Sequence, residues 1–65
     1  MNITPRTKLI GLIGHPVEHS LSPQLHNALY REYGLDYIYV AFDIAPGDVA
    51  QAAAAFRTLS FVGFN

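Results

Sequence analysis

Two serines one residue apart, Ser20 and Ser22, come directly before Pro23 and have the clearest chemical potential in this chain. A hydroxyl can donate a hydrogen bond to a carboxylate oxygen without adding charge or a long flexible stem. Ser22 as N-cap and Pro23 at the first helical position predict that a helix begins here, and the free amides and dipole of a helix start attract an anion. The pair is therefore predicted to form a seat for the carboxylate of a small organic acid.

A structural interpretation of the same serines stays open. Ser22 could merely cap the helix and Ser20 could be a solvated loop residue, which is the commoner situation for two isolated serines. A phosphate site is not favoured, because the stretch from Gly11 to Pro23 has neither the Gly-x-x-x-x-Gly-Lys-Ser/Thr loop nor the Gly-x-Gly-x-x-Gly turn. No nucleotide site is assigned to it.

The remaining polar side chains are expected to be structural. Zinc sites need three or four converging ligands, whereas His15 lies in a loop beside a proline and His26 lies one turn into the predicted helix. We therefore expect neither a metal site nor a histidine acid–base pair, and we assign His19 to ordering its loop. Glu18 and Asp43 are also expected to be structural. Four tyrosines are expected to pack with their hydroxyls at the surface: Tyr30, Tyr33, Tyr37 and Tyr39.

The serines follow a strand and open a helix. Residues 8–14 are almost continuously apolar, which is typical of a strand covered on both faces in a parallel sheet. Residues 15–21 form a loop, and a helix of about three turns then runs from Ser22 to a stop at Gly34. Its apolar residues recur at helical spacing: Leu25, Ala28, Leu29 and Tyr33.

A second strand, a second helix and a third strand complete the pattern. Residues 36–44 are rich in β-branched and aromatic side chains, and Pro46-Gly47-Asp48 opens a helix. Ser60 stands where a glycine stop would be usual, and residues 61–65 begin the third strand. The inner stripe of the second helix is predicted to be Val49, Ala52, Ala53, Phe56 and Leu59.

This alternation predicts an α/β fold, the βαβαβ start of an open, mostly parallel three-layer sheet domain with strand order 2-1-3. Ligands of such sheets bind at the carboxyl ends of the strands, where residues 15–22 lie. The third strand would be an unpaired apolar edge, which invites aggregation, so we expect the chain to continue beyond Asn65.

Composition excludes several classes of function. The chain has 65 residues, is 51% hydrophobic and has no cysteine, so it is one small domain without a disulfide or a thiolate zinc site. A net charge of −1 without clustered Lys or Arg argues against nucleic acid and anionic membrane as partners. No apolar run has the length of a membrane span or a signal-peptide core, so a cytoplasmic location is expected.

Three separated motifs resemble shikimate dehydrogenase. The substrate-binding domain of that family begins with a strand ending in Gly-x-x-Gly-x-Pro, followed by His-Ser-x-Ser-Pro and a helix with His-Asn. The matching residues here are Gly11-Leu-Ile-Gly14-His-Pro16, His19-Ser-Leu-Ser-Pro23 and His26-Asn27. The family continues with Gly-x-Asn-Val-Thr-Val-Pro-x-Lys, and this chain ends on Gly63-Phe64-Asn65. The likeness covers residues 8–65, with mild departures at Ser60 and Phe64.

The resemblance implies that residues 1–65 are the N-terminal part of the shikimate-binding domain of a longer enzyme. It implies that Ser20 and Ser22 hold the carboxylate of shikimate or 3-dehydroshikimate, and it places Asn65 beside the site, either touching substrate or tying backbone. NADP is the implied cofactor, for reversible reduction of 3-dehydroshikimate to shikimate on the pathway to chorismate and the aromatic amino acids. The catalytic lysine, its partner aspartate and the NADP-binding Rossmann domain would lie outside this chain, which alone is predicted to be inactive.

Three alternatives stay open. A quinate or dual quinate/shikimate dehydrogenase would present the same kind of seat to the carboxylate of quinate. A non-catalytic binding module could have kept the serines and lost the lysine or the cofactor domain. The 65 residues could also be a truncated remnant, although the exposed edge strand argues against it. Apart from substrate, the expected partner is the remainder of the same polypeptide.

Overall fold

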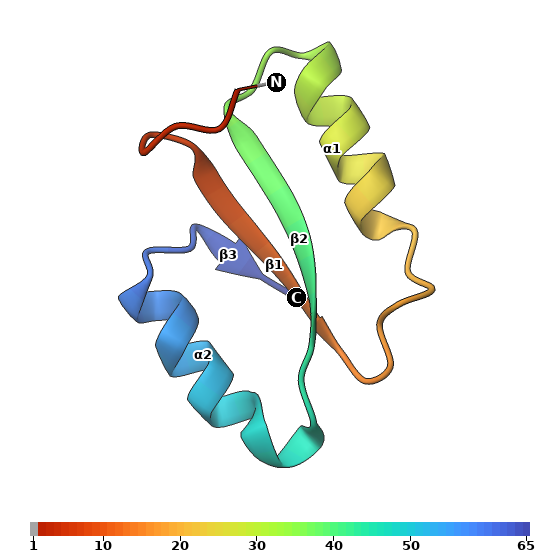
Figure 1. The fold of residues 1–65 in the computed structure, drawn as a ribbon, viewed down its shortest axis with the longest axis vertical. Helices are drawn as coiled ribbons and strands as arrows, with labels where there is room; N and C mark the ends of the chain where they lie inside the picture. The colour runs from red at the N-terminus through yellow and green to blue at the C-terminus, as the bar shows by residue number, and fades with distance from the viewer. Residues whose placement is uncertain (1) are drawn as a thin grey trace.

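The computed structural model describes residues 2–65, in which three strands alternate with two α-helices (Figure 1). In chain order the elements are β1 (Lys8–Gly14), α1 (Ser22–Glu32), β2 (Tyr37–Asp43), the short 3-10 turn η1 (Pro46–Asp48), α2 (Val49–Thr58) and β3 (Gly63–Phe64). The strands form one parallel sheet in the order β2-β1-β3. The predicted fold class and strand order are confirmed.

The central strand β1 pairs with β2 along its whole length and with β3 over two residues, Ile10 opposite Gly63 and Gly11 opposite Phe64. The ladder between β1 and β3 continues past the last labelled residue of β3. The backbone N–H of Asn65 donates to the carbonyl of Gly11 at 3.0 Å, and its carbonyl accepts from the N–H of Ile13 at 2.7 Å. Asn65 is therefore held at the carboxyl edge of the sheet, beside the end of β1.

Four phenylalanine rings cluster between α2 and the sheet, with Phe56 buried at the centre and Phe64 exposed at the margin. The ring centroid of Phe56 lies 4.5 Å from that of Phe61, 5.1 Å from Phe42 and 5.4 Å from Phe64. Gly11 on β1 lies against this cluster, and a Cβ there would come into van der Waals contact with the Phe56 and Phe61 rings at 3.4 Å. Such aromatic contacts explain why the side chain of Phe56 is almost completely buried.

The opposite face of the sheet is covered by α1 through aromatic and polar side chains. The ring of His26 stacks on Tyr39 with centroids 4.3 Å apart, and Tyr30 meets Tyr37 edge-on at 5.4 Å. Tyr39 and Tyr37 occupy alternate positions of β2, whereas Phe42 points to the α2 side, as the period of two in a strand requires. The sheet therefore separates a tyrosine face from a phenylalanine face.

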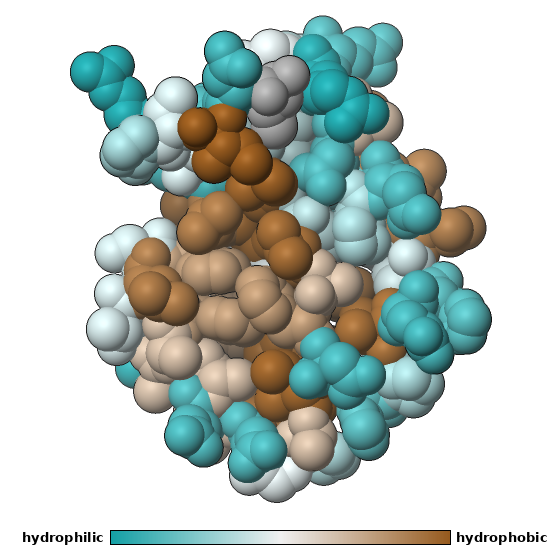
Figure 2. All heavy atoms as spheres, in the orientation of Figure 1, coloured by the Kyte–Doolittle hydropathy of each residue, from teal (hydrophilic) through white to brown (hydrophobic). Residues whose placement is uncertain are grey.

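Both predicted inner stripes are wrong in part. The large apolar side chains of α1 are exposed, and so are those at the two ends of the stripe of α2: Leu25, Leu29, Tyr33, Val49 and Leu59. Helical periodicity identifies an apolar face but not the element that covers it, and in residues 2–65 nothing covers these side chains. In Figure 2 apolar residues spread over the face that includes α2, whereas hydrophilic residues gather around α1 and near the N-terminus.

Both helices end in the same way. Gly34 has φ +66°, as predicted for a left-handed stop, and Ser60 takes the same conformation with φ +63° although it is not a glycine. After α1 the Leu35 N–H donates to the Tyr30 carbonyl at 2.8 Å, and after α2 the Phe61 N–H donates to the Phe56 carbonyl at 2.9 Å. These bonds define Schellman ends, which turn the chain back towards the sheet. In the described chain neither helix is long and apolar enough to span a bilayer.

Candidate functional site

The site predicted from the sequence lies in the loop between β1 and α1, at the carboxyl edge of the sheet (Figure 1). β1 ends at Gly14, and the side chain of Val17 packs 3.2 Å from the position a Gly14 Cβ would occupy. The backbone then turns, with the N–H of Ser20 donating to the carbonyl of Val17 at 3.0 Å. Ser20 and Ser22 are both half-buried. The loop therefore brings the two serines together at the helix start.

The predicted cap of α1 is wrong by one residue. Leu21, with φ −91° and ψ −5°, is the N-cap, Ser22 is the first helical residue and Pro23 the second. Instead of Ser22 capping the helix, the Oγ of Ser20 accepts a hydrogen bond from the backbone N–H of Ser22 at 3.2 Å. A hydroxyl oxygen that accepts from an amide keeps its own proton for another acceptor. Ser20 can thus support the helix and donate to a ligand at the same time.

The amides of α1 contribute less to an anion seat than the sequence suggested. The first helical bond runs from the N–H of Leu25 to the carbonyl of Leu21, at 3.1 Å. In the first turn, Pro23 has no N–H and that of Ser22 is taken by Ser20, so the N–H of Gln24 is left to donate to an anion. The hydroxyls of Ser20 and Ser22 are therefore the main donors that this loop offers to a carboxylate.

One residue that the sequence singled out only as part of a motif ties α1 to the sheet. Asn27 donates from Nδ2 to the backbone carbonyl of Tyr39 at 2.9 Å and accepts at Oδ1 from the backbone N–H of Tyr39 at 2.8 Å. Tyr39 lies on the edge strand β2. The available signal was an asparagine, a poor helix former, in the middle of a helix, where it usually has a packing or bonding reason.

Tyr39 also approaches Asn65. The Nδ2 of Asn65 lies 3.5 Å from the hydroxyl oxygen of Tyr39, whose side chain is 3% exposed. The expectation that the tyrosine hydroxyls lie at the surface is therefore wrong for Tyr39. The contact places the Asn65 side chain on the same face of the sheet as α1, so the structure brings α1, β2 and the end of β3 into one network.

The three histidines do not converge. His15 pairs through Nδ1 with the Asp43 carboxylate at 2.7 Å, and both side chains are about half exposed. The Nε2 of His19 lies 3.7 Å from the Glu18 carboxylate in open solvent, so this residue does little to order the loop. His26 donates from Nδ1 to the carbonyl of Ser22 at 2.9 Å. Among residues 2–65 no three potential ligands gather as a metal site would require.

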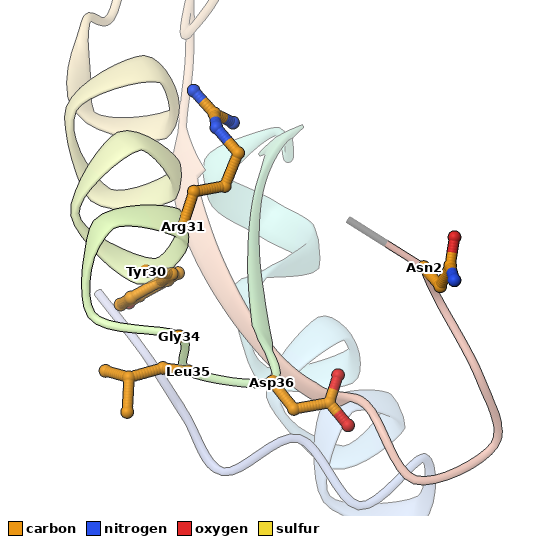
Figure 3. Close-up of a pocket in the computed structure, with 6 residues that line it drawn as sticks. All are labelled: Asn2, Tyr30, Arg31, Gly34, Leu35 and Asp36. Carbon is orange, nitrogen blue, oxygen red and sulfur yellow. The ribbon is translucent and has the colours of Figure 1, made fainter.

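A hollow of about 370 Å³ lies elsewhere, at the amino end of β2 (Figure 3). Six residues line it: Asn2, Tyr30, Arg31, Gly34, Leu35 and Asp36. Burial, assisted by the nearby Tyr39 and Tyr37 phenols, raises the pKa of Tyr30 above its ordinary value of 10.0. Because the amino and carboxyl ends of parallel strands lie at opposite edges of a sheet, this hollow is separate from the serine pair.

Known proteins share this arrangement. A solved shikimate dehydrogenase in complex with NADP+ superposes with a TM-score of 0.93 at 52% identity, covering 98% of this chain and 22% of that chain. The shikimate 5-dehydrogenase of Listeria monocytogenes, in complex with shikimate and NAD, gives a TM-score of 0.93 at 42% identity, over 100% of this chain and 22% of that chain.

Sequence relatives agree with these structures. The shikimate dehydrogenase (NADP(+)) of Trichormus variabilis is 56% identical over 63 residues, which are 97% of this chain and 22% of the relative. That of Methanocaldococcus jannaschii is 52% identical with the same coverage, so the chain spans about a fifth of the length of these relatives. The model of the shikimate dehydrogenase substrate binding domain matches residues 12–65. This chain belongs to the family of shikimate dehydrogenase substrate-binding domains.

Proposed function

We propose that residues 1–65 are the N-terminal part of the shikimate-binding domain of an NADP-dependent shikimate dehydrogenase. The longer enzyme reversibly reduces 3-dehydroshikimate to shikimate, on the pathway to chorismate and the aromatic amino acids. The named relatives support the reaction. The observation that carries the role of this chain is the hydroxyl pair at the start of α1, where Ser20 holds the Ser22 amide and keeps its own proton available.

The contribution of this chain is binding and orientation. The hydroxyls of Ser20 and Ser22 donate to the two oxygens of the substrate carboxylate. The backbone N–H of Gln24 adds a donor at the positive end of α1. Hydrogen bonds to a charged acceptor hold the acid end of the ring in one orientation. NADP supplies the hydride in such enzymes, and the residues that hold it lie outside this chain. Residues 1–65 alone are expected to show no turnover.

Quinate is a second candidate substrate. Its carboxylate offers the same two acceptor oxygens to the hydroxyls of Ser20 and Ser22, so the seat suits both acids. The groups that distinguish their rings must then be read by residues outside this loop. Turnover measured with shikimate and with quinate as alternative substrates separates a shikimate enzyme from a quinate enzyme or a dual one.

The proposal is tested with the full-length protein, by following NADP+ reduction in the presence of shikimate. We expect turnover with shikimate and tight dependence on its carboxylate, so that shikimate methyl ester reacts poorly. A second test replaces the matching residues of the Methanocaldococcus jannaschii relative by residues 1–65 of this chain, where 52% identity favours a folded chimera. Absence of shikimate binding in both the full-length protein and the folded chimera would overturn the proposal.

A further inference from the structure

We propose that Asn27 is a positioning residue for the acid seat: its two hydrogen bonds to Tyr39 set where the Ser20 and Ser22 hydroxyls lie relative to the sheet. The inference rests on the proposed function, because it concerns the same seat. Asn27 itself does not reach the substrate in this arrangement, since both polar atoms of its side chain are engaged by the backbone of β2.

The two hydrogen bonds of Asn27 resemble a backbone pairing between neighbouring strands. β2 is an edge strand, and Asn27 meets both the N–H and the carbonyl of Tyr39, at 2.8 Å and 2.9 Å. A side-chain amide has the same donor and acceptor as a peptide group, so it pairs with the edge as a neighbouring strand would. Sliding α1 along the sheet would lengthen and misalign both bonds together, because each is directed across the strand. The pair therefore defines one position of the helix.

The other contacts between α1 and the sheet are less directional. The leucines of α1 are exposed, and the rings that cover the sheet are those of His26 over Tyr39 and Tyr30 beside Tyr37. Aromatic contacts stabilise several offsets between rings and do not select one register. Asn27 is thus the contact that selects the axial position of the helix.

The position set at Asn27 is transmitted to the serines over a short, bonded path. Ser22 lies five residues away, roughly 7.5 Å along the helix axis. His26, the neighbour of Asn27, donates to the Ser22 carbonyl at 2.9 Å, and the Ser22 amide donates to Ser20 at 3.2 Å. These bonds couple the first turn of α1 to the turn that holds Asn27, so a displacement of one moves the other.

Tyr39 links the position of α1 to the end of β3. Its backbone holds α1 through Asn27, and its hydroxyl lies 3.5 Å from Nδ2 of Asn65 at the end of β3. The same residue is therefore the reference for groups on two elements that border the carboxyl edge. Losing the bonds of Asn27 would shift the hydroxyl pair relative to Asn65, and displacements of about 1 Å in such sites reduce rates by up to about 100-fold.

The test uses the full-length protein with Asn27→Asp, Asn27→Ala and the matched control Glu32→Ala. Asn27→Asp keeps the shape and one acceptor but loses the donor to the Tyr39 carbonyl, and Glu32 is an exposed side chain at the other end of the same helix. We expect the Kd and the KM for shikimate to rise at least about 10-fold in both Asn27 variants, with the KM for NADP+ within about twofold of wild type. The control stays within about twofold for both ligands.

A pH series distinguishes positioning from a general loss of stability. A protonated carboxyl regains a donor, so the shikimate deficit of Asn27→Asp relative to wild type should narrow as the pH falls towards the ordinary carboxyl pKa of about 4, while that of Asn27→Ala should not. An unchanged Kd for shikimate in both folded variants, beside a wild type that binds, overturns this inference alone. A wild type that does not bind shikimate overturns the proposed function with it.

Discussion

Alanine substitutions at Ser20 and at Ser22 should have different effects on the stability of the fold. Ser20→Ala removes a donor to the ligand and also the acceptor of the Ser22 amide at 3.2 Å. Ser22→Ala removes a hydroxyl that makes no side-chain hydrogen bond within residues 2–65, so only the ligand loses a partner. Both variants are expected to weaken shikimate binding, but only Ser20→Ala is expected to destabilise the start of α1.

Magnitudes follow from the bonds involved. A hydrogen bond to a charged acceptor contributes about 1.5–3 kcal/mol, and 1.4 kcal/mol corresponds to a factor of ten, so each variant should raise the Kd for shikimate by about 10- to 100-fold. Loss of a side chain that satisfies a helix-start amide costs about 1 kcal/mol. Ser20→Ala should lower the free energy of unfolding by that amount, and Ser22→Ala by less than about 0.5 kcal/mol.

Calorimetric titration with shikimate and with its methyl ester, combined with urea unfolding of the same variants, measures both effects. The ester lacks the carboxylate charge, so its already weak binding should change little on either substitution. Undiminished affinity for shikimate in the double variant Ser20→Ala and Ser22→Ala would refute the carboxylate seat. Equal losses of stability in the two single variants would refute the assignment of the amide bond to Ser20.

Two further predictions concern the helix ends and alkaline pH. Ser60→Gly removes the strain of a left-handed backbone at a serine and should raise the free energy of unfolding by about 1 kcal/mol. Gly34→Ala imposes the left-handed backbone on an alanine and should lower the free energy of unfolding by about 1 kcal/mol. Urea unfolding measures both changes, and changes of the same sign would contradict the reasoning. Burial raises the pKa of Tyr30, helped by Tyr39 and Tyr37, so the folded state keeps this proton longer than the unfolded state. The contribution of the neutral Tyr30 phenol to stability is complete below the ordinary pKa of 10.0 and is lost as the pH rises through the raised pKa. Tyr30→Phe should therefore make the fall of stability at alkaline pH shallower, which unfolding measured at several pH values would reveal.

The order of elements was predictable because local patterns determine it. The apolar run of β1 and the left-handed stop at Gly34 are both readable from a few adjacent residues, and the structure has them where they were expected. Two crossover helices between three strands leave few topologies, so the strand order followed as well. The serine pair was placed at the sheet edge by the same logic, since a loop after a parallel strand lies there.

Contacts between distant residues were not predictable in this way. The N-cap moved to Leu21 because the Ser20 side chain reached the Ser22 amide, a detail of loop geometry that residue type does not specify. The bonds of Asn27 to Tyr39 join residues 12 positions apart, and they depend on how α1 lies across β2. The neighbouring elements likewise determine which face of a helix is buried. The spacing of the leucines in the sequence does not identify those elements.

The division of aromatic residues between the two faces of the sheet has a spectroscopic consequence. Residues 1–65 contain four tyrosines and no tryptophan, and the rings of Tyr30, Tyr37 and Tyr39 all lie on the α1 side, with the imidazole of His26 stacked on Tyr39. The phenylalanines behind the sheet are nearly silent at wavelengths that excite tyrosine. Within this part of the protein, tyrosine fluorescence should therefore respond to movement of α1 and not to movement of α2.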